Sequence, residues 1–288
     1  MNKTILKWAG SKAGVMPALS LHLPQGDRLV EPFAGSCAVM MNTDFPAYLV
    51  VDVNPDLINM YRQIKEITNP FIVTAMKLFI DNEKAEDYYR IREEFNSCPS
   101  LTLLQRATYF LYLNRNGYRG LCRYNRKGEF NIPYGNYKKP YFPLAEIEAF
   151  AERAQRAEFI CADFRETLGM VKTGDVVYCD PPYHGAFTDY HTGGFSEDDQ
   201  HSLACILLGI SEQNPVAVSN SDTLFTRSIF RAFDITRINV ARSVGVAAGK
   251  SKCATEIVAV RGPKASPVFI GVDMGASDDY SAIIPVAQ

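Results

Sequence analysis

The sequence lacks the residue patterns that hold disulfide frameworks and metal ions. Its seven cysteines are odd in number, scattered and never spaced as CxxC, which is typical of reduced thiols in a cytosolic protein. The four histidines show no ligand spacing, so we expect no metal site. No apolar run approaches the roughly 18 residues that span a bilayer, and the N-terminal segment has charge but no apolar signal-peptide core. These absences predict a cytoplasmic protein with no metal, no membrane span and no obligate protein partner.

An excess of charge of either sign is also missing. The 288 residues include 30 Lys and Arg against 32 Asp and Glu, and 47% are hydrophobic, which excludes a disordered, collagenous or coiled-coil chain. Residues 101–143 are an exception, because they carry eight basic residues against one acid, Glu129, together with ten Phe or Tyr. Interleaved basic and aromatic side chains suit phosphate pairing and base stacking. A solvated basic face over core aromatics has the same composition, so composition alone leaves both interpretations open.

Short apolar runs alternate with helical patterns along most of the chain. Strands are predicted at 28–33, 48–53, 159–163, 176–180, 216–219 and 236–241, and helices at 37–43, 55–66, 196–213 and 222–232. This alternation is typical of a doubly wound α/β fold, and continuous apolar strands suit burial on both faces. Between about 55 and 144 the pattern instead predicts consecutive helices, at 55–66, 69–81, 84–96 and 102–114, before the basic aromatic loop. Residues 237–260 predict a β-hairpin with a long tip.

We therefore predict one α/β domain that is split in the sequence. Its first part covers residues 1–54, a mainly helical insertion covers 55–144, and the second part covers 145–262. Residues 263–288 form an extension with no assigned role.

The stretch 30–39 combines a strand, a turn of small residues and a helix start. Ala34, Gly35 and Ser36 let a ligand approach the backbone, and the helix N-terminus favours polar or anionic groups. Asp52 ends the next predicted strand, where a carboxylate is placed to accept the hydroxyls of a ribose. The GxGxxG turn is absent, which argues against a dinucleotide-dependent oxidoreductase and favours a nucleoside without phosphates, such as S-adenosylmethionine. A tight turn that binds no ligand is the remaining alternative.

A second motif, Asp180-Pro181-Pro182-Tyr183, ends another predicted strand. Prolines lack N–H donors and restrict the backbone, so the loop can hold its carbonyl oxygens toward a ligand. An amine there would donate one hydrogen to the Asp180 carboxylate and one to the Pro181 carbonyl, which makes the nitrogen nucleophilic. Tyr183 offers a flat face on which a base can stack. A proline-rich turn with a structural aspartate is the alternative, but together the two motifs indicate methyl transfer to a base amine.

The segments KWAGSK (7–12), EPFAGS (31–36) and DPPY (180–183), in this order around the basic segment, resemble the Dam family of DNA adenine N6-methyltransferases. The similarity extends from residue 4 to about 262 and includes LNRNGYRGLCRYNRKGEFNIPYG (113–135). It implies a Rossmann-like methyltransferase sheet, S-adenosylmethionine as cofactor, double-stranded DNA as partner, and a bacterial or phage-infected cell. It also implies base flipping, direct in-line attack by the adenine amine, and GATC as the target. Ser11 stands where the family usually has glycine, a change expected to alter cofactor contacts without abolishing binding.

Matched position by position, the resemblance implies three sets of site residues. The catalytic set is Asp180, Pro181, Pro182 and Tyr183. The cofactor-binding set is Trp8, Ala9, Gly10, Lys12, Phe33, Ala34, Gly35, Asp52, Asp163 and Phe164. The DNA-binding set is Lys7, Tyr118, Arg119, Leu121, Arg123, Asn125, Tyr137 and Lys138.

Within the DNA-binding set the resemblance implies different tasks. Tyr118 matches an aromatic residue that pushes between bases, which supports flipping. Leu121 and Arg123 match residues that read the base pairs after the adenine, and Lys7 and Tyr137 match contacts to the first guanine. Outside this set, Arg227, Arg242, Lys250 and Lys252 are candidates for phosphate contacts, and an ordinary surface position without a ligand is the more common alternative for such residues.

Three alternatives remain open at the level of sequence. A catalytically silent DNA-binding regulator is expected to have lost Asp180 or the cofactor turn, and both are present. An RNA substrate is not excluded by the motifs, although the resemblance through the recognition loop favours DNA. The same chemistry on a relaxed or different DNA sequence is the third.

Overall fold

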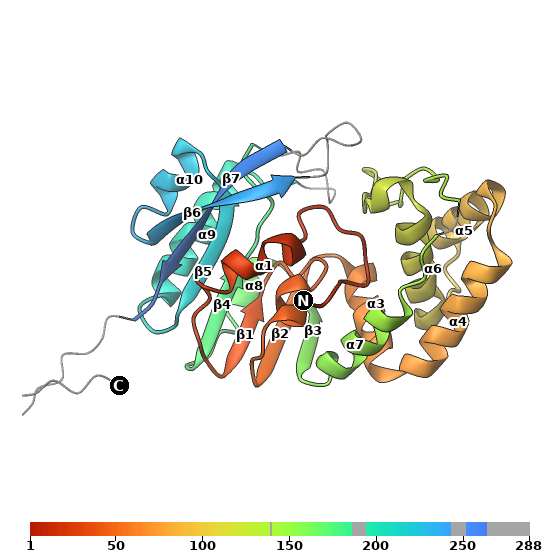
Figure 1. The fold of residues 1–288 in the computed structure, drawn as a ribbon, viewed down its shortest axis with the longest axis horizontal. Helices are drawn as coiled ribbons and strands as arrows, with labels where there is room; N and C mark the ends of the chain where they lie inside the picture. The colour runs from red at the N-terminus through yellow and green to blue at the C-terminus, as the bar shows by residue number, and fades with distance from the viewer. Residues whose placement is uncertain (139, 186–193, 243–251, 264–288) are drawn as a thin grey trace, which may run out of the picture.

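A seven-stranded sheet forms the centre of the protein (Figure 1). The computed structural model describes residues 1–138, 140–185, 194–242 and 252–263. The strands are β1 (Arg28–Glu31), β2 (Ala47–Asp52), β3 (Ala157–Cys161), β4 (Asp175–Cys179), β5 (Val216–Ser221), β6 (Asp234–Arg242) and β7 (Lys252–Arg261). Their order is β3-β2-β1-β4-β5-β7-β6. The first five run parallel, and β7 pairs antiparallel with both β5 and β6. The predicted α/β sheet with a β-hairpin is therefore confirmed, and the predicted hairpin tip at 243–251 lies outside the described residues.

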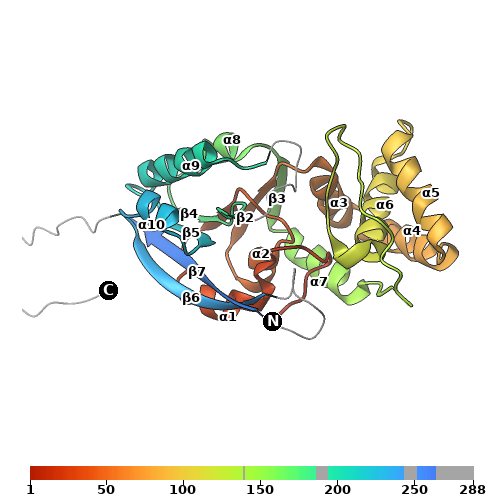
Figure 2. The ribbon, with the colours of Figure 1, turned by 90° about the horizontal axis from the view of Figure 1, so that it is seen from above.

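Helices cover both faces of this sheet (Figure 2). One face packs against α1 (Met16–Leu19), α2 (Ala38–Asn42), α3 (Pro55–Glu66) and α7 (Leu144–Ala154), and the other against α8 (Phe164–Leu168), α9 (Glu197–Ile210) and α10 (Leu224–Ile229). Successive strand residues alternate between the two hydrophobic clusters, as the pleat requires. Leu29 and Val176 belong to one cluster, whereas Val30 and Val177 belong to the other. The continuous apolar strands thus have the doubly covered burial that their sequence predicts.

The predicted consecutive helices are α3, α4 (Thr68–Asp81), α5 (Ala85–Ser97) and α6 (Leu103–Asn116), followed by the short helix η2 (Tyr118–Gly120). Asn54 caps α3 by accepting hydrogen bonds from the backbone N–H groups of Asp56 and Leu57. Helix α3 also packs on the sheet, since Arg62 donates two hydrogen bonds to the Phe159 carbonyl. One hydrophobic cluster runs without interruption from the sheet into α5 and α6. The helical segment is therefore anchored to the sheet through α3.

Several helical segments differ from the sequence expectation, among them the short helices α1 and α8, which were not predicted. Helix α7 was not among the predicted elements, although Ile147, Phe150 and Ala154 are buried at helical spacing. Helix α10 is shorter than the helix predicted at 222–232, because Thr223 caps its start and the chain leaves the helix at Phe230.

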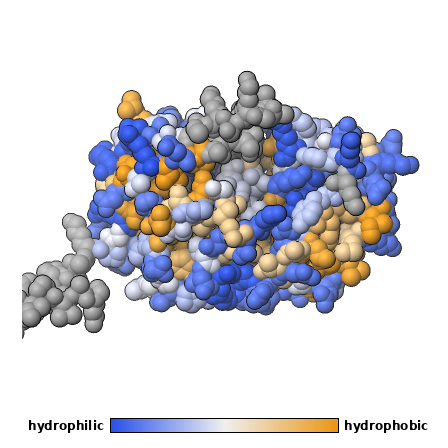
Figure 3. All heavy atoms as spheres, viewed as in Figure 1, coloured by the Kyte–Doolittle hydropathy of each residue, from blue (hydrophilic) through white to orange (hydrophobic). Residues whose placement is uncertain are grey.

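The outer surface of α4 carries several exposed apolar side chains among polar ones. Val73, Met76 and Ile80 are exposed there, and Figure 3 shows hydrophobic residues at this end of the molecule. Exposed apolar side chains are ordinary on folded proteins. Within the described parts of the chain, no helix has the length and hydrophobicity that crossing a membrane requires.

Candidate active site and nucleic-acid face

A cavity of about 740 Å³ opens where the parallel strands end. Glu31 and Asp52 end β1 and β2, and Asp163 and Asp180 follow β3 and β4. Open α/β sheets place their ligands at this edge, outside the carboxyl ends of the strands. Every residue of the predicted catalytic and cofactor-binding sets lines this cavity. The structure thus brings together two motifs that lie about 150 residues apart in the sequence.

The turn after β1 is held from both sides. Gly35 has φ +47°, and a Cβ at this position would lie 2.8 Å from the Trp8 indole nitrogen, so a larger residue is excluded. The Asp52 carboxylate accepts a hydrogen bond of 2.9 Å from the Gly35 N–H. The Tyr61 hydroxyl donates one of 2.6 Å to the Gly35 carbonyl. The motif glycine is therefore required both by its conformation and by its contact with Trp8.

Three phenylalanines form one wall of the cavity. The Phe33 and Phe164 rings stack with centroids 5.5 Å apart, and Phe195 contacts both at 5.7 and 5.6 Å. Asp163 stands beside them and caps α8 by accepting from the Arg165 N–H. Phe195 was not predicted, because it lies in a loop between β4 and α9 and no local pattern marks it. The wall offers a flat apolar surface of the kind that binds a nucleobase.

The DPPY loop carries a salt bridge that the sequence did not predict. The Lys12 ammonium lies 2.7 Å from the Asp180 carboxylate and 4.8 Å from the centroid of the Tyr183 ring. Burial raises the pKa of Asp180, and the Lys12 charge opposes this rise. The Tyr183 hydroxyl donates a 2.7 Å hydrogen bond to the carboxylate of Glu256 on β7. Lys12, assigned from the sequence to the cofactor, thus contacts the predicted catalytic carboxylate itself.

Glu31 is a cavity residue that sequence reasoning did not single out, although it opens the EPFAGS motif. It is 3% exposed, and its Oε1 has no hydrogen-bond partner among the described residues. Burial raises its pKa to about 8, and the neighbouring Asp180 adds to the rise. Among the described residues, the cavity lining also includes Asp52 and Glu256, against a single lysine, Lys12. This surplus of carboxyl groups fits a cationic ligand.

The predicted DNA-binding residues lie outside this cavity, on the loops around η2. The Lys7 ammonium lies 3.8 Å from the centroid of the Tyr137 ring, so the two residues matched to the first guanine are adjacent. The guanidinium of Arg119 stacks over Tyr118 at 5.3 Å, and both side chains are exposed. Arg119 itself has φ +56°. Leu121 follows them as a half-buried residue.

The remaining members of the DNA-binding set differ in whether their side chains are exposed or already bonded within the protein. Arg123 is exposed and donates to the Asn131 side chain at 2.9 Å, and Lys138 is exposed. Asn125 uses its side chain within a turn, where it accepts from the Lys127 and Glu129 N–H groups and donates to the Glu129 carboxylate. In this structure, therefore, the Asn125 side chain stabilises the turn at residues 125–129.

Two residues of the basic segment are not on its outer face. Arg106 forms an ion pair with Asp56 on α3, and the Tyr124 hydroxyl donates to the same carboxylate at 2.7 Å. Arg115 is 7% exposed, and burial lowers its pKa. Composition alone left open whether the basic residues of 101–143 face a nucleic acid. Arg106 is paired with Asp56 and Arg115 is buried, and neither belongs to the predicted DNA-binding set.

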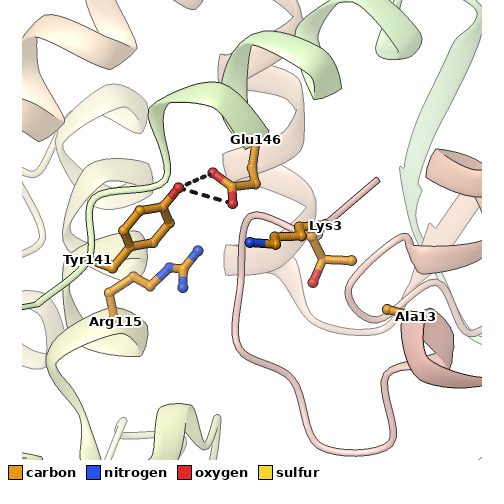
Figure 4. Close-up of a pocket in the computed structure, with 6 residues that line it drawn as sticks. Lys3, Ala13, Arg115, Tyr141 and Glu146 are labelled. Carbon is orange, nitrogen blue, oxygen red and sulfur yellow. Dashed lines mark hydrogen bonds between the residues drawn. The ribbon is translucent and has the colours of Figure 1, made fainter. Parts of the chain in front are cut away.

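Arg115 lines a second, smaller cavity of about 390 Å³ (Figure 4). Its guanidinium lies 5.3 Å from the centroid of the Tyr141 ring. The Tyr141 hydroxyl donates to Glu146 on α7.

Among the residues expected to contact phosphates, Arg227 forms an ion pair with Asp222. The side chains of Arg242, Lys250 and Lys252 lie outside the described parts of the structure.

Comparison with known families agrees with this geometry. Residues 8–244 match the model of the D12 class N6 adenine-specific DNA methyltransferases. The chain belongs to this family: it is an adenine-specific DNA methyltransferase of the Dam type, which uses S-adenosylmethionine as cofactor and DNA as substrate. The oxidoreductase and silent-regulator alternatives are therefore wrong.

Two relatives are similar over nearly their whole length. The retron Ec67 DNA adenine methylase of Escherichia coli is 58% identical over 284 residues, covering 98% of this chain and 99% of the relative. The DNA adenine methylase of E. coli K12 is 44% identical over 269 residues, covering 91% and 96%. The retron match includes most of residues 263–288, for which the sequence showed no resemblance. Among solved structures, the precorrin-6y C5,15-methyltransferase of Geobacter metallireducens covers 91% of this chain with TM-score 0.39 and 12% identity.

Proposed function

We propose that this methyltransferase modifies N6 of adenine in GATC, after flipping the base out of double-stranded DNA. The juxtaposition that carries the proposal is the DPPY loop beside the Gly35 turn in one cavity, with the Lys7–Tyr137 and Tyr118–Arg119 pairs outside it. The E. coli K12 relative is named a DNA adenine methylase, and the resemblance of residues 113–135 to the recognition region of the Dam family supports GATC as the target.

The cavity residues fit the cofactor by their chemistry. The surplus carboxyl groups, including the buried Glu31 with its unpartnered oxygen, suit the positive charges of S-adenosylmethionine. We assign the phenylalanine wall to the adenine ring and Asp52 to the ribose. We assign the Trp8–Lys12 segment to the methionine end. When bound, the cofactor supplies an electrophilic methyl group on its sulfonium.

The loop residues act on the target amine. The Asp180 carboxylate and the Pro181 carbonyl accept its two hydrogens, which withdraws the nitrogen lone pair from the purine ring, and Tyr183 stacks on the flipped base. The Lys12 ammonium keeps Asp180 ionised within a buried site. Transfer is direct and in line, so the chain supplies positioning and no covalent intermediate.

The proposed target is tested by labelled-methyl transfer to three short duplexes, containing GATC, GATT or no adenine in that context. We expect label on the GATC duplex and a large reduction on GATT. Comparable label on both would keep the chemistry and refute the proposed strictness. Label on an RNA of the same sequence but on no DNA duplex would refute double-stranded DNA as the acceptor.

Arg123 is proposed to read the last base pair of the target. Replacing it with alanine should lower the rate on GATC about tenfold to a hundredfold and reduce discrimination against GATT, because one bidentate contact to guanine contributes roughly 1–3 kcal/mol. The measurement is kcat/KM on both duplexes. Arg126→Ala, an exposed arginine on the same loop, is the matched control and should weaken both duplexes equally. An unchanged GATC/GATT ratio for Arg123→Ala would exclude this role, and Leu121→Ala extends the test to the neighbouring pair.

Lys12 is proposed to set the ionisation of Asp180. Without its ammonium, burial raises the pKa of Asp180 further, so the carboxylate is lost at higher pH. For Lys12→Met we expect the acidic limb of the kcat–pH profile to move to higher pH, whereas Lys12→Arg should keep it near the wild-type position. The profile is recorded with saturating cofactor. A limb that does not move in Lys12→Met would show that another group controls the rate.

A further inference from the structure

Two buried amides lie behind the DPPY loop and hold it to the body of the protein. Gln200 on α9 is 1% exposed and Asn220 at the end of β5 is 0% exposed. The Gln200 side chain donates a 2.7 Å hydrogen bond to the Pro182 carbonyl. The Asn220 side chain donates a 3.0 Å hydrogen bond to the Gln200 oxygen. The backbone N–H of His184, just after the motif, donates back to the Asn220 oxygen at 3.2 Å.

The orientation of both amides is fixed by their partners. Because the Gln200 oxygen accepts from Asn220, its NH2 group must point at the loop carbonyl. Because the Asn220 NH2 is used in that bond, its oxygen must face the N–H groups of His184 and Ser221, the latter at 2.8 Å. Ser221 adds a hydroxyl that donates to the His184 carbonyl at 2.8 Å. Each end of the pair therefore has one role, and reversing either amide would leave buried polar groups unpaired.

The composition of the loop makes such external support necessary. Pro181 and Pro182 have no N–H groups, so this part of the loop offers only carbonyl oxygens for hydrogen bonding to the body of the protein. A donor must come from elsewhere, and Gln200 supplies it. Tyr183 is tied on the opposite side to Glu256 on β7. The loop is thus held by α9 and β5 through Gln200 and Asn220, and by β7 through Glu256.

We propose that Gln200 and Asn220 are positioning residues, which fix the DPPY loop so that Asp180 and the Pro181 carbonyl meet the target amine. The inference rests on the proposed function of this loop. Neither residue lines the cofactor cavity, so their effect reaches the reacting atoms through the loop backbone. Their loss should lower kcat and leave cofactor binding intact, because small displacements of a reacting geometry cost about a hundredfold in rate.

The test compares Gln200→Met with Asn214→Leu. Asn214 is also a buried amide, which donates to the Lys172 and Asp175 carbonyls at the opposite end of β4, at 2.7 and 3.0 Å. Both variants lose buried hydrogen bonds, so both should show a lower Tm. For Gln200→Met we expect kcat to fall about tenfold to a hundredfold, with the Kd for S-adenosylhomocysteine changed less than threefold. For Asn214→Leu we expect wild-type kcat below its Tm.

Gln200→Glu provides a signature that a structural role would not give. Its carboxylate cannot donate to the Pro182 carbonyl, whereas its protonated form can. The kcat of this variant relative to wild type should therefore rise as the pH is lowered, while the ratio for Gln200→Met stays flat. Equal kcat for Gln200→Met and Asn214→Leu, or a flat ratio for Gln200→Glu, would overturn the proposal.

These measurements separate the inference from the proposed function on which it rests. The kcat values are measured on whichever adenine-containing duplex the wild-type enzyme methylates. The comparison of variants therefore does not depend on GATC being the correct target. Asp180→Asn, measured in parallel, reports on the loop itself. If that variant kept wild-type kcat, the catalytic role of the loop would be refuted independently of Gln200 and Asn220.

Discussion

Replacing Asp180 with alanine should lower methyl transfer by about 10³-fold, the scale seen when one preorganised polar group is removed from a catalytic site. Within residues 180–183 the Asp180 carboxylate is the only anionic side chain, and it lies 2.7 Å from the Lys12 ammonium. Its loss removes the acceptor for one hydrogen of the amine and leaves a cation in its place. The measurement is single-turnover methyl transfer to the GATC duplex.

Two controls isolate this effect from folding and cofactor binding. Asp180→Asn keeps the size of the side chain but not its charge, so we expect a similar loss. The Kd for S-adenosylhomocysteine and the far-UV circular dichroism of both variants should remain close to wild type. An Asp180→Ala enzyme within tenfold of the wild-type rate would show that another group aligns the amine.

Glu31→Gln should change how the stability of the empty protein depends on pH. Burial raises the pKa of Glu31 from 4.5 to about 8, so the folded state holds this proton more tightly than the unfolded state does. The stabilisation is complete below the unfolded pKa and is lost as the pH rises toward 8. The full loss is roughly 5 kcal/mol, at about 1.4 kcal/mol per pKa unit.

A neutral amide of the same shape has no proton to lose in this pH range. The unfolding free energies of the Glu31→Gln variant and the wild type should therefore diverge as the pH rises. Between pH 5.5 and 8.5 we expect the unfolding free energy of the glutamine variant to gain about 3 kcal/mol relative to wild type. Urea unfolding of both proteins at both pH values measures this difference. Parallel pH dependence would mean that Glu31 is ionised in the folded state.

Local patterns in the sequence were sufficient to predict most of the fold. The strand at 28–33 and the helix at 55–66 correspond to β1 (Arg28–Glu31) and α3 (Pro55–Glu66), because pleat and helix periodicity and the Asn-Pro cap are local signals. The hairpin was also predicted. Its placement with β7 between β5 and β6 depends on pairing across the sheet, which the strand sequences do not specify.

In the site, too, local motifs were predicted from the sequence, whereas contacts between distant segments were not. Gly35, Asp52 and Asp180 stand in recognisable motifs at strand ends, and all three line the cavity. The Lys12–Asp180 salt bridge and the position of Phe195 arise from segments far apart in the chain. Gln200 had no signal of its own, since a glutamine at the fourth position of a capped helix is unremarkable until the loop packs against it.

Nucleoside analysis of the reaction product tests the central claim most directly. The protein is incubated with S-adenosylmethionine carrying a deuterated methyl group and a duplex with one GATC site, and the DNA is digested to nucleosides for mass spectrometry. We predict deuterated N6-methyl-2′-deoxyadenosine as the labelled nucleoside, with none formed by Asp180→Ala. Label on cytosine, or undiminished adenine methylation by Asp180→Ala, would contradict the assignment of this cavity and its DPPY loop.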